Sequence, residues 1–368
     1  MSDPQIDAVT SATDVNLYAA KPREIQRMTA RCLEKGLVPF IQGSPGVGKT
    51  SLLRAIAKAM DLKLIDHRVA GSGPEDFNGL PDLAGEKAVM KPFTMFPTEG
   101  DPIPTNPETG KPYKGWLLHL SEFNSGLPMV TVAAYKLLLE REVGQLKLHE
   151  NVHIVCDGNN DEDRAITQEL GTAMKTRLIW LKMVLDGGKR DQFDEFIKDV
   201  AIPLEWDNRV IAFLHHKPEY LNNFKADSQE STQSVPRTWD FAQSLAKGYE
   251  IGIEDAPLYA GTLGASVGAE FVSFAELFTK IPNLDAVIAD PLNSAMPADQ
   301  GVKWATVAAA VAKADKDNLA ALGEYIEVFP LAFRVMFWRL LQVQKAWVRN
   351  EASFRRAFVA LGTYLYKD

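Results

Sequence analysis

Cysteine is scarce in this chain of 368 residues, which contains only Cys32 and Cys156. Two cysteines so far apart give neither a disulfide framework nor metal-ligand spacing, which is typical of proteins from a reducing compartment. No run of about 18 apolar residues occurs, so we expect no membrane-spanning helix. The N-terminal stretch has no basic segment followed by an apolar run. We therefore expect no secretion signal and a cytoplasmic protein.

Basic residues are also in the minority, with 40 Lys and Arg against 48 Asp and Glu and a formal net charge of −8. Nucleic-acid coats and motors usually carry a basic footprint, so the charge disfavours such a partner without excluding a local basic pore. The histidines do not form a ligand set. His215 and His216 are adjacent and therefore point to different faces of an expected helix, while His119 fits a hydrogen-bonded core position in an apolar strand.

The apolar pattern changes character near residue 186. Before it, apolar strands alternate with amphipathic helices, which predicts a parallel three-layer α/β domain. The strands are expected at 37–41, 62–69, 116–120, 152–156 and 178–184, and the helices at 22–35, 52–60 and 128–140. After it, the pattern is mainly helical. The expected helices are 210–215, 238–249, 258–274, 302–312, 329–348 and 353–366.

One segment of the first half carries a specific chemical signature. The complete pattern G-x-x-x-x-G-K-[ST] stands between the expected strand at 37–41 and the expected helix at 52–60. Glycines let successive backbone N–H groups turn around phosphates, and the helix N-terminus adds positive potential. In such a loop Lys49 contacts the β- and γ-phosphates and the Thr50 hydroxyl binds Mg²⁺. The expected nucleotide-binding residues are Gly43, Ser44, Pro45, Gly46, Val47, Gly48, Lys49, Thr50 and Ser51.

A second acidic element follows the strand at 116–120. A carboxylate at the end of an apolar strand can polarise water against the γ-phosphate, so Glu122 is the expected general base. The alternative is a strand-end glutamate that simply faces solvent. The Asp that usually precedes such a glutamate and organises Mg²⁺ is replaced by Ser121, a neutral and weaker ligand. Hydrolysis is then either slow or assisted by another acid such as Asp157.

Further polar residues stand next to strands or open a helix. Asn159 and Asn160 follow the strand at 152–156, where an amide could orient the attacking water, although Asn-rich turns are common. Arg177 directly precedes an apolar strand, and Arg237 opens a helix after a proline. The charged fork of arginine suits a γ-phosphate. For either arginine alone, an ordinary surface or salt-bridged side chain is the simpler explanation.

The order and spacing of these motifs resemble the AAA+ ATPases, and within them the MoxR-like branch of chaperone-like activators. Residues 74–79 are similar to its P-x-D-x-x-G segment, and residues 121–124 to its D-E-x-N Walker B motif with the Asp lost. Residues 140–144 match its E-R-x-V hairpin entry. The resemblance covers about residues 20–270. It implies an ATP-hydrolysing enzyme with a three-layer parallel-sheet AAA+ P-loop core, followed by an all-α lid and a C-terminal helical region.

The resemblance also implies roles for individual residues. Asn159 would be sensor 1, with Asn160 as the second choice, and Ser121 would join Thr50 at the metal. Arg177 would be the arginine finger and Arg237 the sensor-2 arginine of a P-R-x-W lid motif. Because an arginine finger completes the ATP site of a neighbouring subunit, the family implies a homo-hexameric ring.

Family members commonly act on a protein partner, so we expect a protein substrate, with a von Willebrand A-type (VWA) domain protein as the first candidate. Insertions at 76–115 and 142–148 resemble the family's helix-2 and pre-sensor-1 insertions, which usually face the pore and touch substrate. Phe96, Tyr113 and Lys147 are candidate contacts there. Packing or solvation of the insertions is the alternative for each of them.

Other functions remain open. A nucleic-acid motor is the first alternative, because helicase loaders share these insertions, but it is disfavoured by the net charge and by the lack of a recognisable DNA-binding module. A nucleotide-dependent structural assembly with little hydrolysis would fit Ser121. A small-molecule kinase would leave the sensor, finger and lid residues unexplained. The predicted organisation is a loose arm at 1–20, an α/β nucleotide-binding domain at 21–186, a helical lid at 187–275 and a helical extension at 276–368.

Overall fold

The chain divides into two compact units between Leu185 and Asp186, close to the domain boundary that we expected at 186. The computed structural model describes residues 18–365 except 164, 166 and 169. Within that described part, every helix is too short or too polar to cross a membrane.

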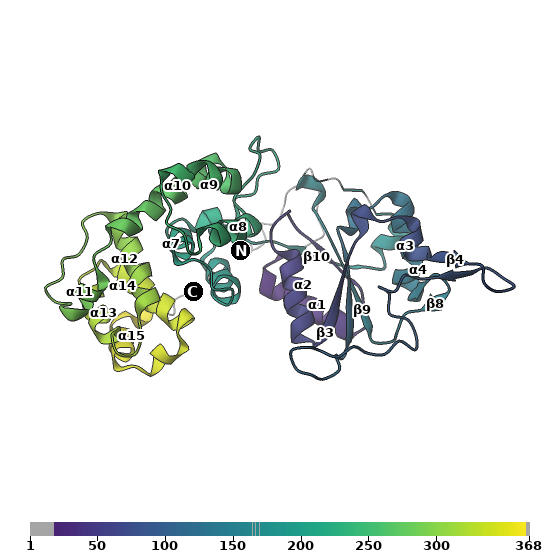
Figure 1. Cartoon of the computed structure of the whole chain (residues 1–368), viewed down its shortest axis with the longest axis horizontal. Helices are drawn as coiled ribbons and strands as arrows, with labels where there is room; N and C mark the ends of the chain where they lie inside the picture. The colour runs from purple at the N-terminus through teal and green to yellow at the C-terminus, as the bar shows by residue number, and fades with distance from the viewer. Residues whose placement is uncertain (1–17, 164, 166, 169, 366–368) are drawn as a thin grey trace, which may run out of the picture. The chain divides into compact units, whose positions relative to one another are not determined.

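A six-stranded parallel sheet forms the centre of the first unit, in the order β1-β10-β2-β9-β6-β3. The helices α1 and α2 pack on one face, and α4 packs on the other with α3 beside it (Figure 1). This is the predicted three-layer α/β class. The strands are β1 (Ala19–Ala20), β2 (Pro39–Gln42), β3 (Leu62–Arg68), β6 (Gly115–Ser121), β9 (Val152–Gly158) and β10 (Ile179–Met183).

The residues at which the helices of this unit begin and end can be explained from the sequence. α1 (Pro22–Glu34) and α4 (Pro128–Glu140) each begin at a proline, whose fixed φ suits the first helical position. α4 ends where Arg141 takes a left-handed φ of 55°. α2 (Lys49–Ala59) begins three residues earlier than predicted, because Gly48 with φ 104° ends the loop. The short helices α3 and α5 are Pro74–Asn78 and Thr172–Lys175.

Strand β6 is buried along its whole length because helices cover both faces of the sheet. Side chains alternate between the faces. Leu118 and Leu120 therefore join the core beneath α4, whereas His119 and Ser121 lie on the face that α2 covers. The polar residues at and near the end of β6 thus point to the same side of the sheet as the helix that follows the phosphate loop.

One expectation for the first unit needs correction. Ala19 and Ala20, predicted within a loose arm, form β1 and pair with the outer edge of β10. Residues 1–17 of that arm lie outside the described residues. The expected insertion at 76–115 begins within α3 and contains the antiparallel hairpin of β4 (Leu80–Asp82) and β5 (Val89–Lys91). The hairpin predicted from its entry motif at 140–144 is formed by β7 (Glu142–Val143) and β8 (Leu146–Lys147).

The second unit is mainly helical, as predicted. Its α-helices are α6 (Arg190–Phe196), α7 (Asn208–His216), α8 (Pro236–Ala246), α9 (Ala256–Leu263), α10 (Ala265–Glu276), α11 (Leu284–Ala289), α12 (Gln300–Lys313), α13 (Leu319–Ile326), α14 (Leu331–Gln344) and α15 (Ala352–Leu365). The π-helix Ile197–Ala201 continues α6, and 3₁₀ turns join several other helices.

Several helix boundaries in this unit differ from the prediction. The helix expected at 258–274 is broken by Gly264, whose φ of 93° folds α9 back against α10. The helix expected at 329–348 begins only after Pro330 and ends at Gln344. α13 had not been predicted. The aromatic side chains Phe333, Phe337 and Trp338 of α14 are all buried.

Candidate nucleotide-binding site

The phosphate loop connects the end of β2 to α2 in a conformation that requires glycine. Gly46 and Gly48 have φ angles of 78° and 104°, in the left-handed region that side chains disfavour. A Cβ on Gly43 would lie 2.9 Å from the Met183 carbonyl oxygen. Helical hydrogen bonding begins with the N–H of Leu52, which donates to Gly48, so the N–H groups of the first turn of α2 project toward the loop. This geometry suits a bound phosphate.

Lys49 lies inside this loop and is buried. Its ammonium donates to the carbonyl oxygens of Gly43 and Ser44, the latter at 3.2 Å. It also donates to Oδ1 of Asn159 at 3.1 Å. The loop lysine and the first candidate for sensor 1 are therefore in direct contact, although 110 residues separate them in the chain.

The second candidate, Asn160, touches the loop through a different residue. Its Nδ2 donates to Ser44 Oγ at 3.2 Å and to Asp163 Oδ2 at 2.9 Å, and Ser44 Oγ donates to Asp163 Oδ1 at 3.3 Å. Burial raises the pKa of Asp163, while hydrogen bonds from Ser44 and Asn160 oppose that rise. We had not predicted a role for Asp163. The run of three acidic residues at 161–163 was the only signal for it in the sequence.

Asn124 fixes the position of the segment that carries the two sensor candidates. This buried side chain hydrogen-bonds the backbone of Asn159 through both its amide nitrogen and its amide oxygen. A Cβ on Gly158 would lie only 2.2 Å from Asn124 Oδ1, so the preceding residue must be glycine for this contact to form. The family resemblance places Asn124 in the Walker B-like motif at 121–124, and the sequence alone assigned it no role.

Glu122 follows β6 with a left-handed φ of 53°. Its side chain is 39% exposed and lies 3.5 Å from the Arg68 guanidinium. Its backbone N–H donates to Asp157 Oδ1 at 2.8 Å. Ser121 is buried at the strand end, and Thr50 is half-buried at the start of α2. The predicted base therefore stands at the sheet edge where β6 and β9 end, with solvent access.

Beneath this edge, His119 lies between two carboxylates on the α2 side of the sheet. Its Nδ1 is 3.1 Å from Asp66 and its Nε2 is 3.5 Å from Asp157, and within the described residues neither nitrogen is aligned for a hydrogen bond, so these contacts are ion pairs when His119 is protonated. Burial alone would lower the pKa of His119, but its direct contacts with the carboxylates of Asp157 and Asp66, together with their charges, raise it to about 9. The predicted core position is confirmed, and its partners are two acids rather than neutral groups.

The oxygen donors at this edge fit Mg²⁺. This hard cation is usually held by one or two carboxylates together with phosphate oxygens and water. The hydroxyls of Thr50 and Ser121 and the carboxylate of Asp157 are donors of that kind. In the described part of the chain, this edge included, no group of three His, Cys, Asp or Glu has the arrangement of a metal site, so phosphate oxygens and water would have to complete the coordination here.

Neither of the two candidate arginines takes part in the contacts described above. Arg177 follows α5 in the first unit and is exposed, with its Nη1 donating to the Ala173 carbonyl at 2.7 Å. Arg237 is the second residue of α8 in the second unit and is exposed as well. Their roles as arginine finger and sensor 2 stay predictions.

The two predicted insertions pack against each other. Gly144 turns β7 into β8 with φ 59°, and a Cβ there would lie 2.7 Å from the Met90 carbonyl of β5. Phe96 is only 2% exposed, so its expected role as a surface contact is wrong. Its ring packs against Phe77, which gives it a core role instead. Tyr113 is half-buried and Lys147 is exposed.

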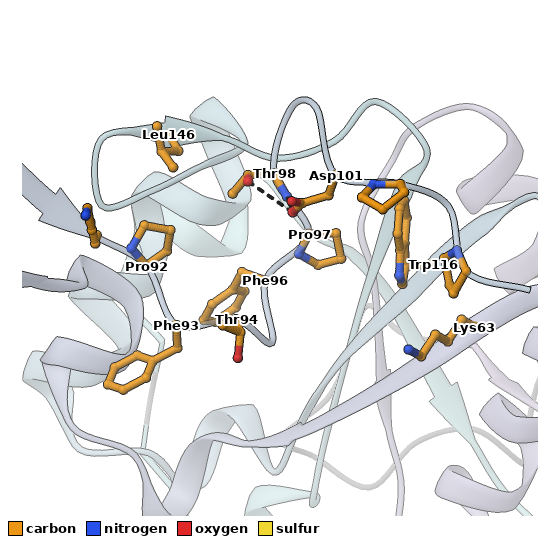
Figure 2. Close-up of a pocket in the computed structure, with 13 residues that line it drawn as sticks. Lys63, Pro92, Phe93, Thr94, Phe96, Pro97, Thr98, Asp101, Trp116 and Leu146 are labelled. Atoms are coloured by element: carbon orange, nitrogen blue, oxygen red, sulfur yellow. Dashed lines mark hydrogen bonds between the residues drawn. The ribbon is translucent and has the colours of Figure 1, made fainter.

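A groove of about 460 Å³ lies beside these insertions. Figure 2 shows Pro92, Phe93 and Pro97 along it, with Trp116 from β6 and Leu146 from β8 at its edges. Thr98 donates through its hydroxyl to Asp101 at 3.1 Å and holds part of the rim. The groove is open and partly apolar, and none of its lining residues belongs to the phosphate loop.

No protein-family model and no curated protein matches this chain. Three solved structures show a loose overall likeness. A candidate ATPase from Cytophaga hutchinsonii has a TM-score of 0.33 at 14% identity, covering 94% of this chain and 89% of its own. A DNA polymerase III gamma subunit-related protein from Thermotoga maritima has a TM-score of 0.32 at 13% identity, covering 93% and 92%. NtrX from Brucella abortus has a TM-score of 0.35 at 14% identity, covering 97% and 72%. Nothing about the activity of this chain follows from superpositions as loose as these.

Proposed function

We propose that this chain is an ATP-binding and ATP-hydrolysing protein of the AAA+ type. The observation that carries the proposal is the position of Lys49, whose ammonium lies among the loop carbonyls and contacts Asn159. A lysine held there can exchange a carbonyl for a phosphate oxygen without leaving the loop. The amide of Asn159 would then lie next to the same phosphate and could orient a water.

The residues at the sheet edge support hydrolysis as well as binding. Mg²⁺, when bound, would neutralise charge on the phosphates, with Thr50 and Ser121 as its expected ligands. Glu122 would accept the proton of the attacking water. Its ion pair with Arg68 is partly exposed, and such pairs contribute only about 0–1 kcal/mol. Glu122 can therefore leave Arg68 at little cost.

We further propose that ATP turnover drives the remodelling of a protein partner by a ring of identical subunits, with a VWA-domain protein as the first candidate. The exposed apolar side chains on the two insertion hairpins support this reading. They are Leu80 (50% exposed), Leu83 (76%), Val89 (41%) and Leu146 (44%). Grouped apolar side chains that remain exposed are typical of protein contact sites.

Substitution of Glu122 by Gln tests both parts. The variant should bind ATP as the wild type does and lose most ATP hydrolysis, because the amide cannot accept the proton. Loaded with ATP, it should remain assembled in size-exclusion chromatography and retain a protein partner in a pull-down. Lys49→Ala is the matched control that should bind neither ATP nor partner.

One alternative has a specific structural basis. Ser121 leaves β6 without its own carboxylate, which favours a nucleotide-dependent assembly with little turnover. Ordinary turnover that disappears in Glu122→Gln would exclude that alternative. Retention of polynucleotide alone, with salt-sensitive stimulation of ATPase activity, would instead favour a nucleic-acid motor.

A further inference from the structure

The carboxylate that is missing from β6 has a counterpart on the neighbouring strand. β6 and β9 are adjacent and parallel, with Leu120 paired to Cys156. One step further along both strands are Ser121 and Asp157. On its other side Asp157 pairs in register with Ile41 of β2, the strand that leads into the phosphate loop. Asp157 therefore stands between the Walker B strand and the loop strand.

The Asp157 side chain points to the face on which nucleotide would bind. Its Oδ2 lies 3.5 Å from His119 on the α2 side of the sheet, and Ser121, two residues after His119, shares that side. Its Oδ1 accepts the N–H of Glu122, the predicted base. Only 4% of the side chain is exposed.

A buried carboxylate at this position needs an explanation beyond packing. Removing a charge from water is costly unless partners satisfy it. The Glu122 N–H takes one acceptor site of Asp157, and His119 faces its Oδ2 at 3.5 Å as an ion-pair partner, whereas two carboxylate oxygens offer about four acceptor sites. Asp157 thus retains acceptor capacity next to the Ser121 hydroxyl.

We propose that Asp157 replaces the lost Walker B aspartate, so that the carboxylate serving Mg²⁺ comes from β9 while β6 contributes only the Ser121 hydroxyl. The carboxylate therefore lies on the strand next to β6, at the same edge of the sheet. Asp157 acts as a positioning residue through water or through Ser121. This inference rests on the proposed binding of ATP with Mg²⁺, and it predicts normal turnover despite Ser121.

The test compares the affinity for a non-hydrolysable ATP analogue in Mg²⁺ and in EDTA, measured with purified full-length protein. Mg²⁺ should tighten binding to the wild type. In Asp157→Asn the gain in affinity on adding Mg²⁺ should be about 10–100-fold smaller than in the wild type. This is the range expected when a residue behind a metal ligand is removed. Binding in EDTA should change little, which separates a metal effect from general damage to the loop.

Two further variants keep the test informative if Asp157→Asn is unstable. The double variant Ser121→Asp/Asp157→Asn moves the acid back to β6 and should restore the Mg²⁺-dependent gain. Asp66→Asn removes the other partner of His119 and is the matched control. It should lower the melting temperature and leave the Mg²⁺-dependent gain intact.

The outcomes separate this inference from the proposed function. If Asp157→Asn keeps the full gain, or if Asp66→Asn loses as much of it, the inference is overturned while ATP binding stands. A wild-type chain that binds no nucleotide with or without Mg²⁺ overturns both. Rescue by the double variant supports the inference directly, because an aspartate at position 121 on β6 then replaces the aspartate at position 157 on β9 in the same role.

Discussion

The side chain of Asn124 holds the backbone of Asn159 at two points. Its Nδ2 donates to the Asn159 carbonyl at 2.8 Å, and its Oδ1 accepts the Asn159 N–H at 3.2 Å. Asn124 follows β6 and Asn159 follows β9, so this pair connects the end of β6 to the end of β9. The orientation of the Asn159 amide toward Lys49 depends on that connection.

Replacing Asn124 by Ala should therefore reduce ATP turnover more than ATP binding. The Asn159 backbone groups would lose both partners, and an unsatisfied buried polar group costs about 1–3 kcal/mol. Urea denaturation should show a loss of that size, and kcat should fall by more than the affinity for ATP. Gly158→Ala should have a similar effect, since its Cβ would displace the same Asn124 oxygen. Wild-type kcat in both variants would contradict this role.

The local parts of this site are predictable from sequence because each depends on neighbouring residues. The loop needs glycine at its two left-handed positions and a lysine at the start of the helix, and all three occur in one short segment. α4 shows the same principle, since Pro128 and Arg141 mark its two ends. These features require no knowledge of distant contacts.

The remaining parts depend on strand order, which the sequence does not display. His119 lies between Asp66 and Asp157 only because β3, β6 and β9 are neighbours in the sheet. The burial of Phe96 likewise depends on contacts with Phe77, formed when the insertion folds back. The break at Gly264 was missed because the apolar pattern continues through it.

The two sensor candidates can be separated by matched substitutions. Asn159 contacts Lys49, whereas Asn160 contacts Ser44 and Asp163. Asn159→Ala should retain ATP binding and lower kcat about 10-fold or more, as expected for a group that orients a reacting water. Asn160→Ala should mainly weaken binding, because it loosens the loop near Ser44. Single-turnover kinetics and equilibrium binding on both variants would check this, and the reverse pattern would make Asn160 the sensor.

The apolar hairpin tips should matter for partner contact and not for chemistry. Leu83 and Leu146 are exposed on the two insertions and have no place in the nucleotide site. The double substitution Leu83→Ser/Leu146→Ser, made in the ATP-loaded Glu122→Gln background, should reduce the protein retained in a pull-down several-fold. In the wild-type background it should leave basal ATPase activity unchanged. Leu292→Ser, at a leucine of the second unit that is about as exposed as Leu83, is the control. Undiminished capture would exclude the hairpins as the contact.

Stability below neutral pH should depend on His215. This residue of α7 is buried with its ring against Phe193, and its Nε2 has no hydrogen-bond partner within the described part of the chain. Burial, followed by the charges of Arg190 of α6 and Arg339 of α14, lowers its pKa to about 3. The folded protein therefore keeps His215 neutral at pH values where the unfolded chain protonates it near pH 6.5.

Because the unfolded state binds the extra proton, stability should fall as the pH drops from 6.5 toward 3. For His215 alone the loss at pH 5 is about 2 kcal/mol, from 1.5 pH units below 6.5 at 1.36 kcal/mol each. His215→Leu should remove this contribution, so that its unfolding free energy declines less between pH 6.5 and 5. Between pH 7 and 8 the two proteins should show parallel pH profiles, because His215 is neutral in both states there. Urea denaturation across this range measures the difference, and parallel profiles below pH 6.5 as well would show that His215 is protonated in the folded protein.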